Sequence, residues 1–214
     1  MKRVTLFCGH YGSGKTNVAV NFAKRLALAG RPTALADIDV VNPYFRSADS
    51  RAELEALGVR VIALPFANTN VDLPALPSEV YGLVERRDVY AVLDVGGDDR
   101  GAFALGRFTP YILEENDYEM LLVVNFFRPL TRTAKEALDV MREIERAAGI
   151  PFTGIVNNSN LGEETTAADV EGTAKEADRL VSLAGLPLVF TSFDGRLSPD
   201  CERPFSLALQ PKII

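Results

Sequence analysis

Short apolar runs recur along the chain, separated by longer segments in which apolar residues return with helical spacing. Most of these runs are rich in Val, Ile, Leu and Phe, as is typical of strands buried on both faces of a parallel sheet. The runs predict strands at Val4–Cys8, Thr33–Ala36, Val59–Leu64, Val89–Asp94, Met120–Val124, Phe152–Val156 and Pro187–Phe190.

The segments between the runs place apolar residues three and four positions apart, on one face of a helix. After the first strand, Val18, Phe22 and Leu26 form such a stripe, and Gly30 ends this helix. We expect further helices in a segment ending near Gly58, from Ser78 to about Arg87, in 101–116 with Pro110 as an interruption, in Leu130–Ala148 and in Ala167–Ala184.

Strands that alternate with helices predict an α/β fold of three layers, with a mainly parallel central sheet flanked by helices. The 214 residues contain no internal repeat or linker, so residues 1–214 are predicted to form a single domain. The proline-containing segment Pro65–Pro77 is predicted to be a loop, and the tail beyond Ser198 to be irregular.

A glycine-rich loop, Gly9–Thr16, joins the first strand to the first helix. Its sequence, Gly-His-Tyr-Gly-Ser-Gly-Lys-Thr, matches the phosphate-binding template G-x-x-x-x-G-K-[ST] at every fixed position. Its backbone N–H groups can converge on a phosphate, while Lys15 can reach the β- and γ-phosphates and Thr16 can bind Mg²⁺. The nucleotide-binding residues predicted here are Gly9, His10, Tyr11, Gly12, Ser13, Gly14, Lys15, Thr16 and Asn17.

Acidic residues follow two of the predicted strands. Asp37 and Asp39 come after the second strand, and Asp94 ends the fourth within the sequence Asp94-Val-Gly-Gly97. Ligands of open parallel sheets bind at the carboxyl ends of the strands, where carboxylates can hold Mg²⁺ or orient an attacking water. We therefore predict that Thr16 and Asp94 bind Mg²⁺, with Asp37 and Asp39 as candidates for a further carboxylate; the family resemblance described below favours Asp39 as the third residue of the metal site.

Composition narrows the class of protein. A formal net charge of −6 disfavours a broad nucleic-acid-binding surface, and no apolar run is long enough for a membrane span. Because the first strand starts almost at once, we expect no signal peptide and a cytoplasmic protein. Cys8 and Cys201 form no C-x-x-C motif, and Cys8 is most simply a core residue.

Four blocks together resemble the MinD/ParA/nitrogenase-iron-protein class of P-loop ATPases over nearly the full length. They are Gly9–Thr16, Asp37–Asn42, Asp94–Gly97 and Gly154–Ser159. The resemblance implies a P-loop NTPase fold, with Lys15 and Asp39 as catalytic residues, Asp39 positioning the attacking water. It also implies that Asn158, or alternatively Asn157, reads the base. The chain has no N-K-x-D sequence, the usual guanine reader, so ATP is favoured over GTP.

His10 departs from this family, whose signature lysine should lie there and act across a dimer interface. Because this lysine is absent, the sequence does not decide whether the chain forms a nucleotide-dependent homodimer. Arg46, Arg100 or Arg128 could supply a substitute cation, and the sequence selects none of them.

The leading hypothesis is a Mg²⁺-dependent ATPase that acts as a nucleotide-driven switch for an unidentified partner protein. One alternative is a small-molecule enzyme similar to dethiobiotin synthetase, in which ATP phosphorylates a substrate near the Pro65–Pro77 loop. Another is a nucleotide-sensing regulator with little hydrolysis. No nucleic-acid or membrane partner is expected.

Overall fold

The computed structural model describes residues 1–38, 48–63, 78–97 and 99–208. Within these ranges the strands form one sheet in the order β3-β2-β4-β1-β5-β6-β7-β8, and each neighbouring pair is parallel. The strands are β1 (Val4–Cys8), β2 (Thr33–Asp37), β3 (Arg60–Ala63), β4 (Tyr90–Asp94), β5 (Tyr118–Val124), β6 (Gly154–Asn157), β7 (Leu188–Asp194) and β8 (Pro204–Leu207).

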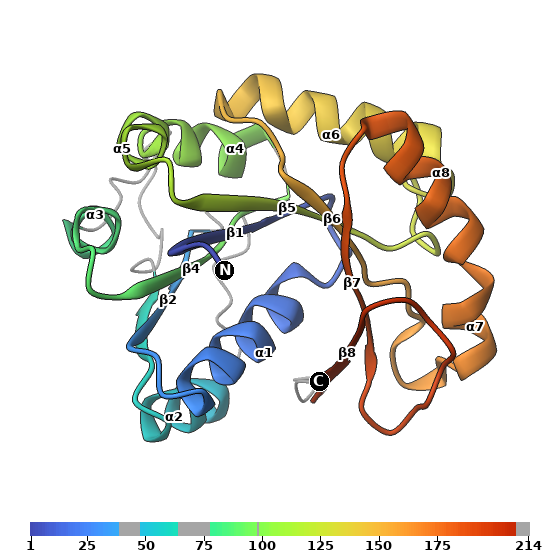
Figure 1. Cartoon of the computed structure of the whole chain (residues 1–214), viewed down its shortest axis with the longest axis horizontal. Helices are drawn as coiled ribbons and strands as arrows, with labels where there is room; N and C mark the ends of the chain where they lie inside the picture. Colours follow the sequence, from blue (N-terminus) through green and yellow to red (C-terminus); the bar gives the residue numbers. More distant parts are fainter. Residues whose placement is uncertain (39–47, 64–77, 98, 209–214) are drawn as a thin grey trace.

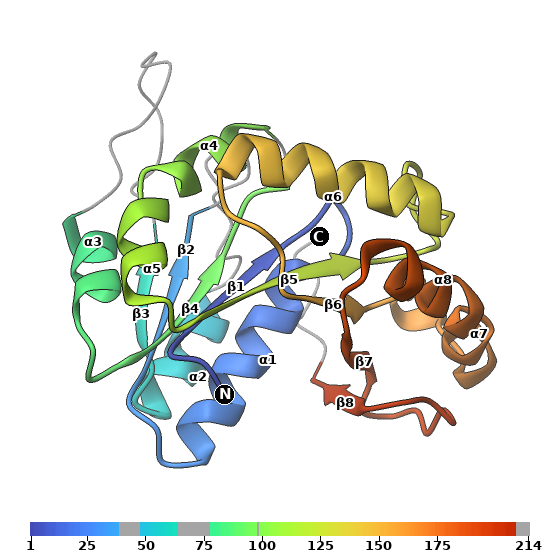
Figure 2. The ribbon, with the colours of Figure 1, turned by 45° about the horizontal axis from the view of Figure 1, so that its top comes forward.

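Helices cover both faces of this sheet, which confirms the predicted three-layer α/β fold (Figures 1 and 2). One face packs against α1 and α2, and the other against α3, α4, α5, α6 and α8. The helices are α1 (Lys15–Leu28), α2 (Ala48–Ala56), α3 (Ser78–Glu85), α4 (Asp99–Gly106), α5 (Thr109–Glu115), α6 (Ala134–Ala148), α7 (Ala167–Gly172) and α8 (Ala174–Ala184), with a 3₁₀ turn at Gly162–Glu164.

Strand β1 shows why an unbroken apolar run specifies a central strand. Leu6 and Cys8 belong to the core cluster on the α6 side, whereas Phe7 belongs to the cluster on the α1 side. Successive side chains of a strand point to opposite faces, so a strand with helices on both sides is apolar at nearly every position; in β1 only Thr5 is polar.

The strand order indicates where on the sheet a ligand is expected to bind. The chain passes from β1 to β2 on one side and later from β4 to β5 on the other, so the connections diverge around β1. Ligands of open α/β sheets bind at the carboxyl ends of strands near such a switch point. The loop after β1 therefore lies where a ligand is expected.

Two predicted helices have different boundaries in the structure. The helix predicted at Leu130–Ala148 begins at Ala134, because Leu130 has a left-handed φ of 66° and Thr133 caps the helix instead. The segment Ala167–Ala184 forms α7 and α8, which are separated at Thr173.

Residues 101–116 form parts of α4 and α5, and Pro110 lies in the first turn of α5. It therefore starts a helix rather than interrupting one, since proline needs no backbone hydrogen bond in a first turn.

The prediction of an irregular tail beyond Ser198 was wrong for Pro204–Leu207, which form β8 beside β7. Phe205 and Leu207 alternate with exposed residues, and Asn21 of α1 bonds both backbone groups of Ala208. Proline is tolerated at the first position of an edge strand, so Pro204 does not prevent pairing.

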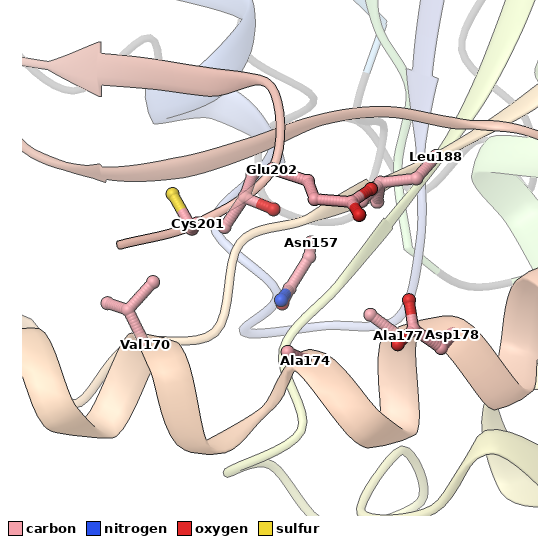
Figure 3. Close-up of a pocket in the computed structure, with 9 residues that line it drawn as sticks. Asn157, Val170, Ala174, Ala177, Asp178, Leu188, Cys201 and Glu202 are labelled. Carbon is pink, nitrogen blue, oxygen red and sulfur yellow. The ribbon is translucent and has the colours of Figure 1, made fainter. Parts of the chain in front are cut away.

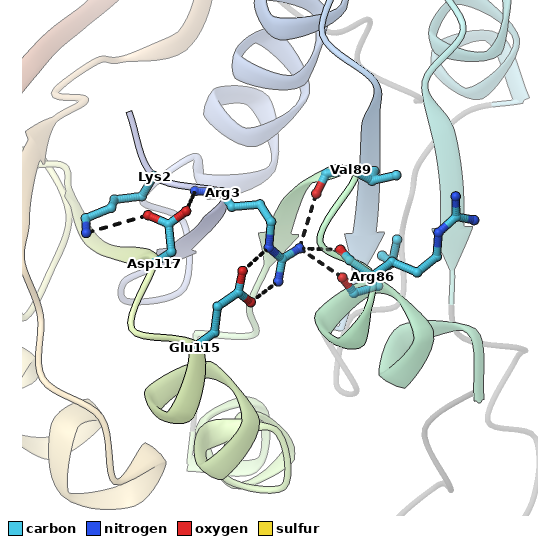
Figure 4. Close-up of polar contacts among 7 residues, drawn as sticks. Lys2, Arg3, Arg86, Val89, Glu115 and Asp117 are labelled. Atoms are coloured by element: carbon cyan, nitrogen blue, oxygen red, sulfur yellow. Dashed lines mark hydrogen bonds and ion pairs between the residues drawn. The ribbon is translucent and has the colours of Figure 1, made fainter.

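At the amino end of β1, away from the phosphate-binding loop, Arg3 contacts α3, the segment between α3 and β4, and α5 (Figure 4). Its guanidinium pairs with Glu115 of α5 and donates to the carbonyl oxygens of Leu83, Arg86 and Val89 at 3.2, 2.9 and 3.1 Å. The side chains of Arg3 and Glu115 are only 7% and 11% exposed, so this ion pair is internal.

Candidate functional site

The loop Gly9–Thr16, called the phosphate loop below, turns sharply between β1 and α1. A Cβ atom built on Gly9 would lie 2.2 Å from the carbonyl oxygen of Val123 in β5. Gly14 has a left-handed φ of 84°, and a Cβ there would lie 2.4 Å from Nδ2 of Asn158. Only glycine fits these positions, because the loop is pressed against the ends of β5 and β6.

The backbone of the phosphate loop folds back on itself. The Ser13 N–H donates to the carbonyl oxygen of His10 at 3.1 Å, and Nδ1 of His10 lies 3.0 Å from the carbonyl oxygen of Tyr11. Tyr11 is 69% exposed, whereas Ser13 is buried and its hydroxyl has no hydrogen-bond partner among the described residues. A buried hydroxyl without a partner is unusual and suits a cradle built for a polar ligand.

Lys15 and Thr16 begin α1 and lie against the end of β4. Lys15 is 7% exposed, and the Thr16 hydroxyl donates to Oδ2 of Asp94 at 2.5 Å. Asp94 is itself buried at the carboxyl end of β4. The predicted partners Thr16 and Asp94 are thus brought together beside Lys15, as a site for a phosphate-bound Mg²⁺ requires.

Asp37 lies closer to this site than its sequence position indicates. It is the last residue of β2, is 3% exposed, and is in register with Asp94 on the neighbouring strand. Register between separate strands is not readable from one sequence, and the family resemblance favoured Asp39 instead. Asp39, Arg46 and the whole segment Pro65–Pro77 lie outside the described residues.

The described residues contain no group of three or more His, Cys, Asp or Glu side chains that could hold a metal ion alone. The Thr16 hydroxyl and the Asp94 carboxylate are donors that fit Mg²⁺, which proteins bind through one or two carboxylates together with phosphates and waters. Thr16 and Asp94 would hold such an ion, and Asp37 is a further carboxylate beside them.

Gly97, the last residue of the Asp94–Gly97 block, packs directly on the phosphate loop. A Cβ built on it would lie 2.7 Å from both the Gly9 carbonyl oxygen and the Tyr11 nitrogen, and 2.9 Å from Nζ of Lys15. This contact brings the segment after β4 to the phosphate-binding surface. A larger residue at Gly97 would displace the loop or the lysine.

Asn158 lies beneath the phosphate loop. It is 2% exposed, its Nδ2 donates to the Ser13 carbonyl oxygen at 2.6 Å, and its Oδ1 accepts from the Ser192 hydroxyl at 2.7 Å. The alternative residue, Asn157, donates to Thr173 and accepts from Ser159. In this structure the Asn158 amide ties the loop to β7, a contact that the sequence pattern did not reveal.

Cys8 precedes the phosphate loop at the end of β1. Burial raises the pKa of its thiol far above the usual range, while nearby Lys15 lowers it and Asp94 raises it. The thiol is therefore protonated and inert at neutral pH. Cys8 is a core residue, as its sequence context indicated.

Cys201 lines a separate small pocket of about 80 Å³ between α7, α8, the end of β6 and the first half of β7 (Figure 3). Burial, Asp200 and Glu171 raise the pKa of its thiol. Its other lining residues are mostly small or apolar, with Asp178 and Glu202 contributing carboxylates. The pocket contains no residue of the phosphate loop.

No family model and no curated protein matches this sequence. Solved structures of FtsY are similar in fold. Chloroplast FtsY from Physcomitrella patens has a TM-score of 0.58 at 19% identity, covering 89% of this chain and 58% of that one. Cell division protein FtsY from Thermotoga maritima has a TM-score of 0.53 at 21% identity, covering 91% of this chain and 62% of that one.

A third similar structure, the signal recognition particle receptor FtsY from Elizabethkingia anophelis in complex with GDP, has a TM-score of 0.52 at 18% identity. The match covers 91% of this chain and 58% of that one. The chain therefore spans about three fifths of the length of the FtsY chains that it matches. Together with the phosphate loop, these likenesses establish a P-loop NTPase fold. They do not extend to the narrower MinD/ParA resemblance.

No helix among the described residues is long and apolar enough to cross a membrane.

Proposed function

We propose that this chain is a Mg²⁺-dependent nucleoside triphosphatase that acts as a nucleotide-driven switch. The observation that carries the proposal is the Thr16–Asp94 hydrogen bond of 2.5 Å beside the buried Lys15, at a loop closed by glycines. These residues fit the phosphates and the metal ion of a bound nucleotide. Burying charged side chains is costly, so the burial of Lys15 and Asp94 at this loop favours a functional role for them.

Each residue has a role that follows from its chemistry. The amide groups of the phosphate loop would hold the phosphates, and Lys15 would neutralise charge on them. Thr16 and Asp94 would hold Mg²⁺, which supplies further charge neutralisation. We propose that Asp39 orients the attacking water, on the MinD/ParA resemblance.

We propose ATP as the nucleotide for two reasons. The chain has no N-K-x-D sequence, and Asn158 stands where the family resemblance implies a base-reading asparagine. One similar FtsY structure is a complex with GDP, so guanine nucleotides are the necessary comparison. The adenine preference rests on the family resemblance and is separate from the proposal of hydrolysis.

We also propose that the nucleotide state controls binding of a partner protein or of a second copy of the chain. Tyr11 is 69% exposed in the phosphate loop, and Leu130 is 60% exposed in the loop after β5. Tyr11 belongs to the phosphate loop itself, so a partner that binds beside the nucleotide would cover its exposed ring.

Phosphate release from ATP and from GTP, with Mg²⁺ or with a chelator, tests hydrolysis. The wild-type protein should release phosphate only with Mg²⁺, and faster from ATP. Asp94→Asn and Asp39→Ala should lower the rate by about two orders of magnitude, as loss of a catalytic electrostatic group does. A rate that survives both substitutions, or that needs no Mg²⁺, contradicts the proposal.

The oligomeric state should be measured in the same samples by light scattering. Asp39→Ala should accumulate the nucleotide-bound form, and a mass that doubles only with ATP supports the second copy as partner. A monomer under every condition rejects the homodimer and leaves hydrolysis intact.

A further inference from the structure

The loop that follows β5 reaches over the phosphate loop. Cδ and Nε of Arg128 both lie 3.7 Å from the position that a Cβ atom on Gly12 would occupy. Arg128 is exposed, and the structure records no ion pair or side-chain hydrogen bond for it within the described residues. Its guanidinium therefore stands beside the phosphate loop with its donors available.

Asn125 fixes the backbone that carries Arg128. Asn125 is fully buried, and its carbonyl oxygen accepts from the Arg128 N–H at 3.1 Å and from the Thr131 hydroxyl at 2.8 Å. Its Oδ1 accepts from the Phe127 N–H at 3.0 Å, and its Nδ2 donates to the Asn160 carbonyl oxygen at 2.9 Å. The turn is thus held mainly by a buried residue directly after β5, and the buried Ser159 hydroxyl adds a bond by accepting from the Phe126 N–H.

Leu130 shows that this turn is maintained at a cost. Its φ is 66°, in the left-handed region, and its side chain is 60% exposed. A left-handed conformation is unfavourable for a residue other than glycine, because its Cβ atom crowds the following carbonyl oxygen. Such strain collects at functional sites, where the surrounding structure imposes it.

The other basic groups of the phosphate loop leave room for this arginine. Lys15 is 7% exposed and lies on the Gly97 side of the loop. Nδ1 of His10 is engaged with the Tyr11 carbonyl oxygen. Arg128 approaches at Gly12, so Lys15 and Arg128 approach different parts of the loop.

We propose that Arg128 is a phosphate-binding residue that contacts the polyphosphate chain of the nucleotide held by the phosphate loop. This inference rests on the function proposed above and selects one residue among Arg46, Arg100 and Arg128. A guanidinium presents paired N–H donors that match two phosphate oxygens, and charge-assisted hydrogen bonds of this kind are stronger than neutral ones. The contact is with phosphate, so it should not depend on the base.

The test measures binding by titration calorimetry, with Mg²⁺, of ATP, GTP and inorganic tripolyphosphate to four forms of the protein. These are wild type, Arg128→Ala, Arg128→Lys and the matched control Arg132→Ala, which removes an equal charge from an exposed position in the same loop. Arg128→Ala should bind all three ligands about tenfold more weakly, as loss of a charged hydrogen bond predicts. Arg128→Lys should lie between it and wild type, and Arg132→Ala should match wild type.

Two results would overturn this inference while the proposed function stands. One is wild-type affinity in Arg128→Ala, with Lys15→Ala still impaired. The other is an equal loss in Arg128→Ala and Arg132→Ala, which would indicate only a general effect of surface charge. Failure of the wild-type protein to bind any of these ligands would reject both the inference and the proposed function. Melting temperatures of the variants, expected to equal that of wild type, exclude loss of the fold as the cause.

Discussion

At Gly14 one added methyl group would meet the side-chain amide of Asn158, with the new Cβ 2.4 Å from Nδ2. Gly14→Ala should therefore be destabilised both by its φ of 84° and by this clash. Gly30→Ala is the matched control, because Gly30 has a similar φ of 74° but a Cβ atom built on it would meet no other atom within 4 Å. Gly30→Ala should lose only about 1–2 kcal/mol of stability, the cost of a left-handed residue.

Urea denaturation of both variants gives the comparison directly. Gly14→Ala should lose more stability than Gly30→Ala and should also lose nucleotide binding. Equal losses, with binding retained, would show that Asn158 does not confine the phosphate loop.

Asn158 offers a second test at the scale of one residue. Its amide bonds Ser13 and Ser192, so Asn158→Ala should cost about 1–3 kcal/mol by leaving buried groups unsatisfied. If the residue acts by holding the loop, the affinities for ATP and GTP should fall by the same factor. A loss confined to ATP would instead support the base-reading role that the family resemblance implies.

The two thiols should differ in reactivity. Cys8 is fully buried with a strongly raised pKa, while Cys201 is partly exposed. A thiol reagent at pH 8 should label Cys201 in the folded protein, and label both residues in denaturant. Rapid labelling of Cys8 in the native state would mean that β1 opens readily at the phosphate loop.

At the scale of elements, α6 has a complete capping box. The Thr133 hydroxyl accepts from the Glu136 N–H, and the Glu136 carboxylate accepts from the Thr133 N–H. Thr133→Ala should lower the free energy of unfolding by about 1 kcal/mol, whereas Thr133→Ser keeps the cap and should be close to neutral. Thermal denaturation distinguishes them, and equal melting temperatures would show that the cap contributes nothing measurable.

The strands were the most predictable elements, because burial on both faces leaves an unbroken apolar run such as Val4–Cys8. Helix ends were less so. Leu130 has a side chain suited to a helix, but the bonds to Asn125 hold the preceding turn and force a left-handed backbone. Strand β8 was missed because only Phe205 and Leu207 are buried in it, too short a pattern beside Pro204.

The candidate site was predictable where its residues are contiguous in sequence and obscure where they come from different strands. The phosphate loop and Asp94 are recognisable from the sequence alone. The register of Asp37 with Asp94, the tether from Asn158 and the approach of Arg128 to Gly12 arise only when strands pair. Asp39 stays a prediction, since it lies outside the described residues.

At the scale of the whole molecule, Arg3 connects elements that are far apart in sequence. Arg3→Met would leave Glu115 and three carbonyl oxygens without their donor, and should cost about 3–5 kcal/mol. Arg86→Ala is the control, since it removes only an exposed pair with Asp88 and keeps the Arg86 carbonyl oxygen. Urea midpoints should fall for Arg3→Met alone. An unchanged midpoint would mean that the internal pair does not stabilise the fold.

The central claim is that the phosphate loop binds a nucleotide with Mg²⁺, and calorimetric titration of wild type and Lys15→Ala with Mg²⁺-ATP tests it most directly. Lys24→Ala is the matched control, because Lys24 lies in the same helix but pairs with Glu53 at 2.6 Å. Wild type and Lys24→Ala should bind, and Lys15→Ala should bind at least about tenfold more weakly, as loss of a charged hydrogen bond predicts. Equal binding by Lys15→Ala, or no binding of ATP or GTP by the wild type, would contradict the account.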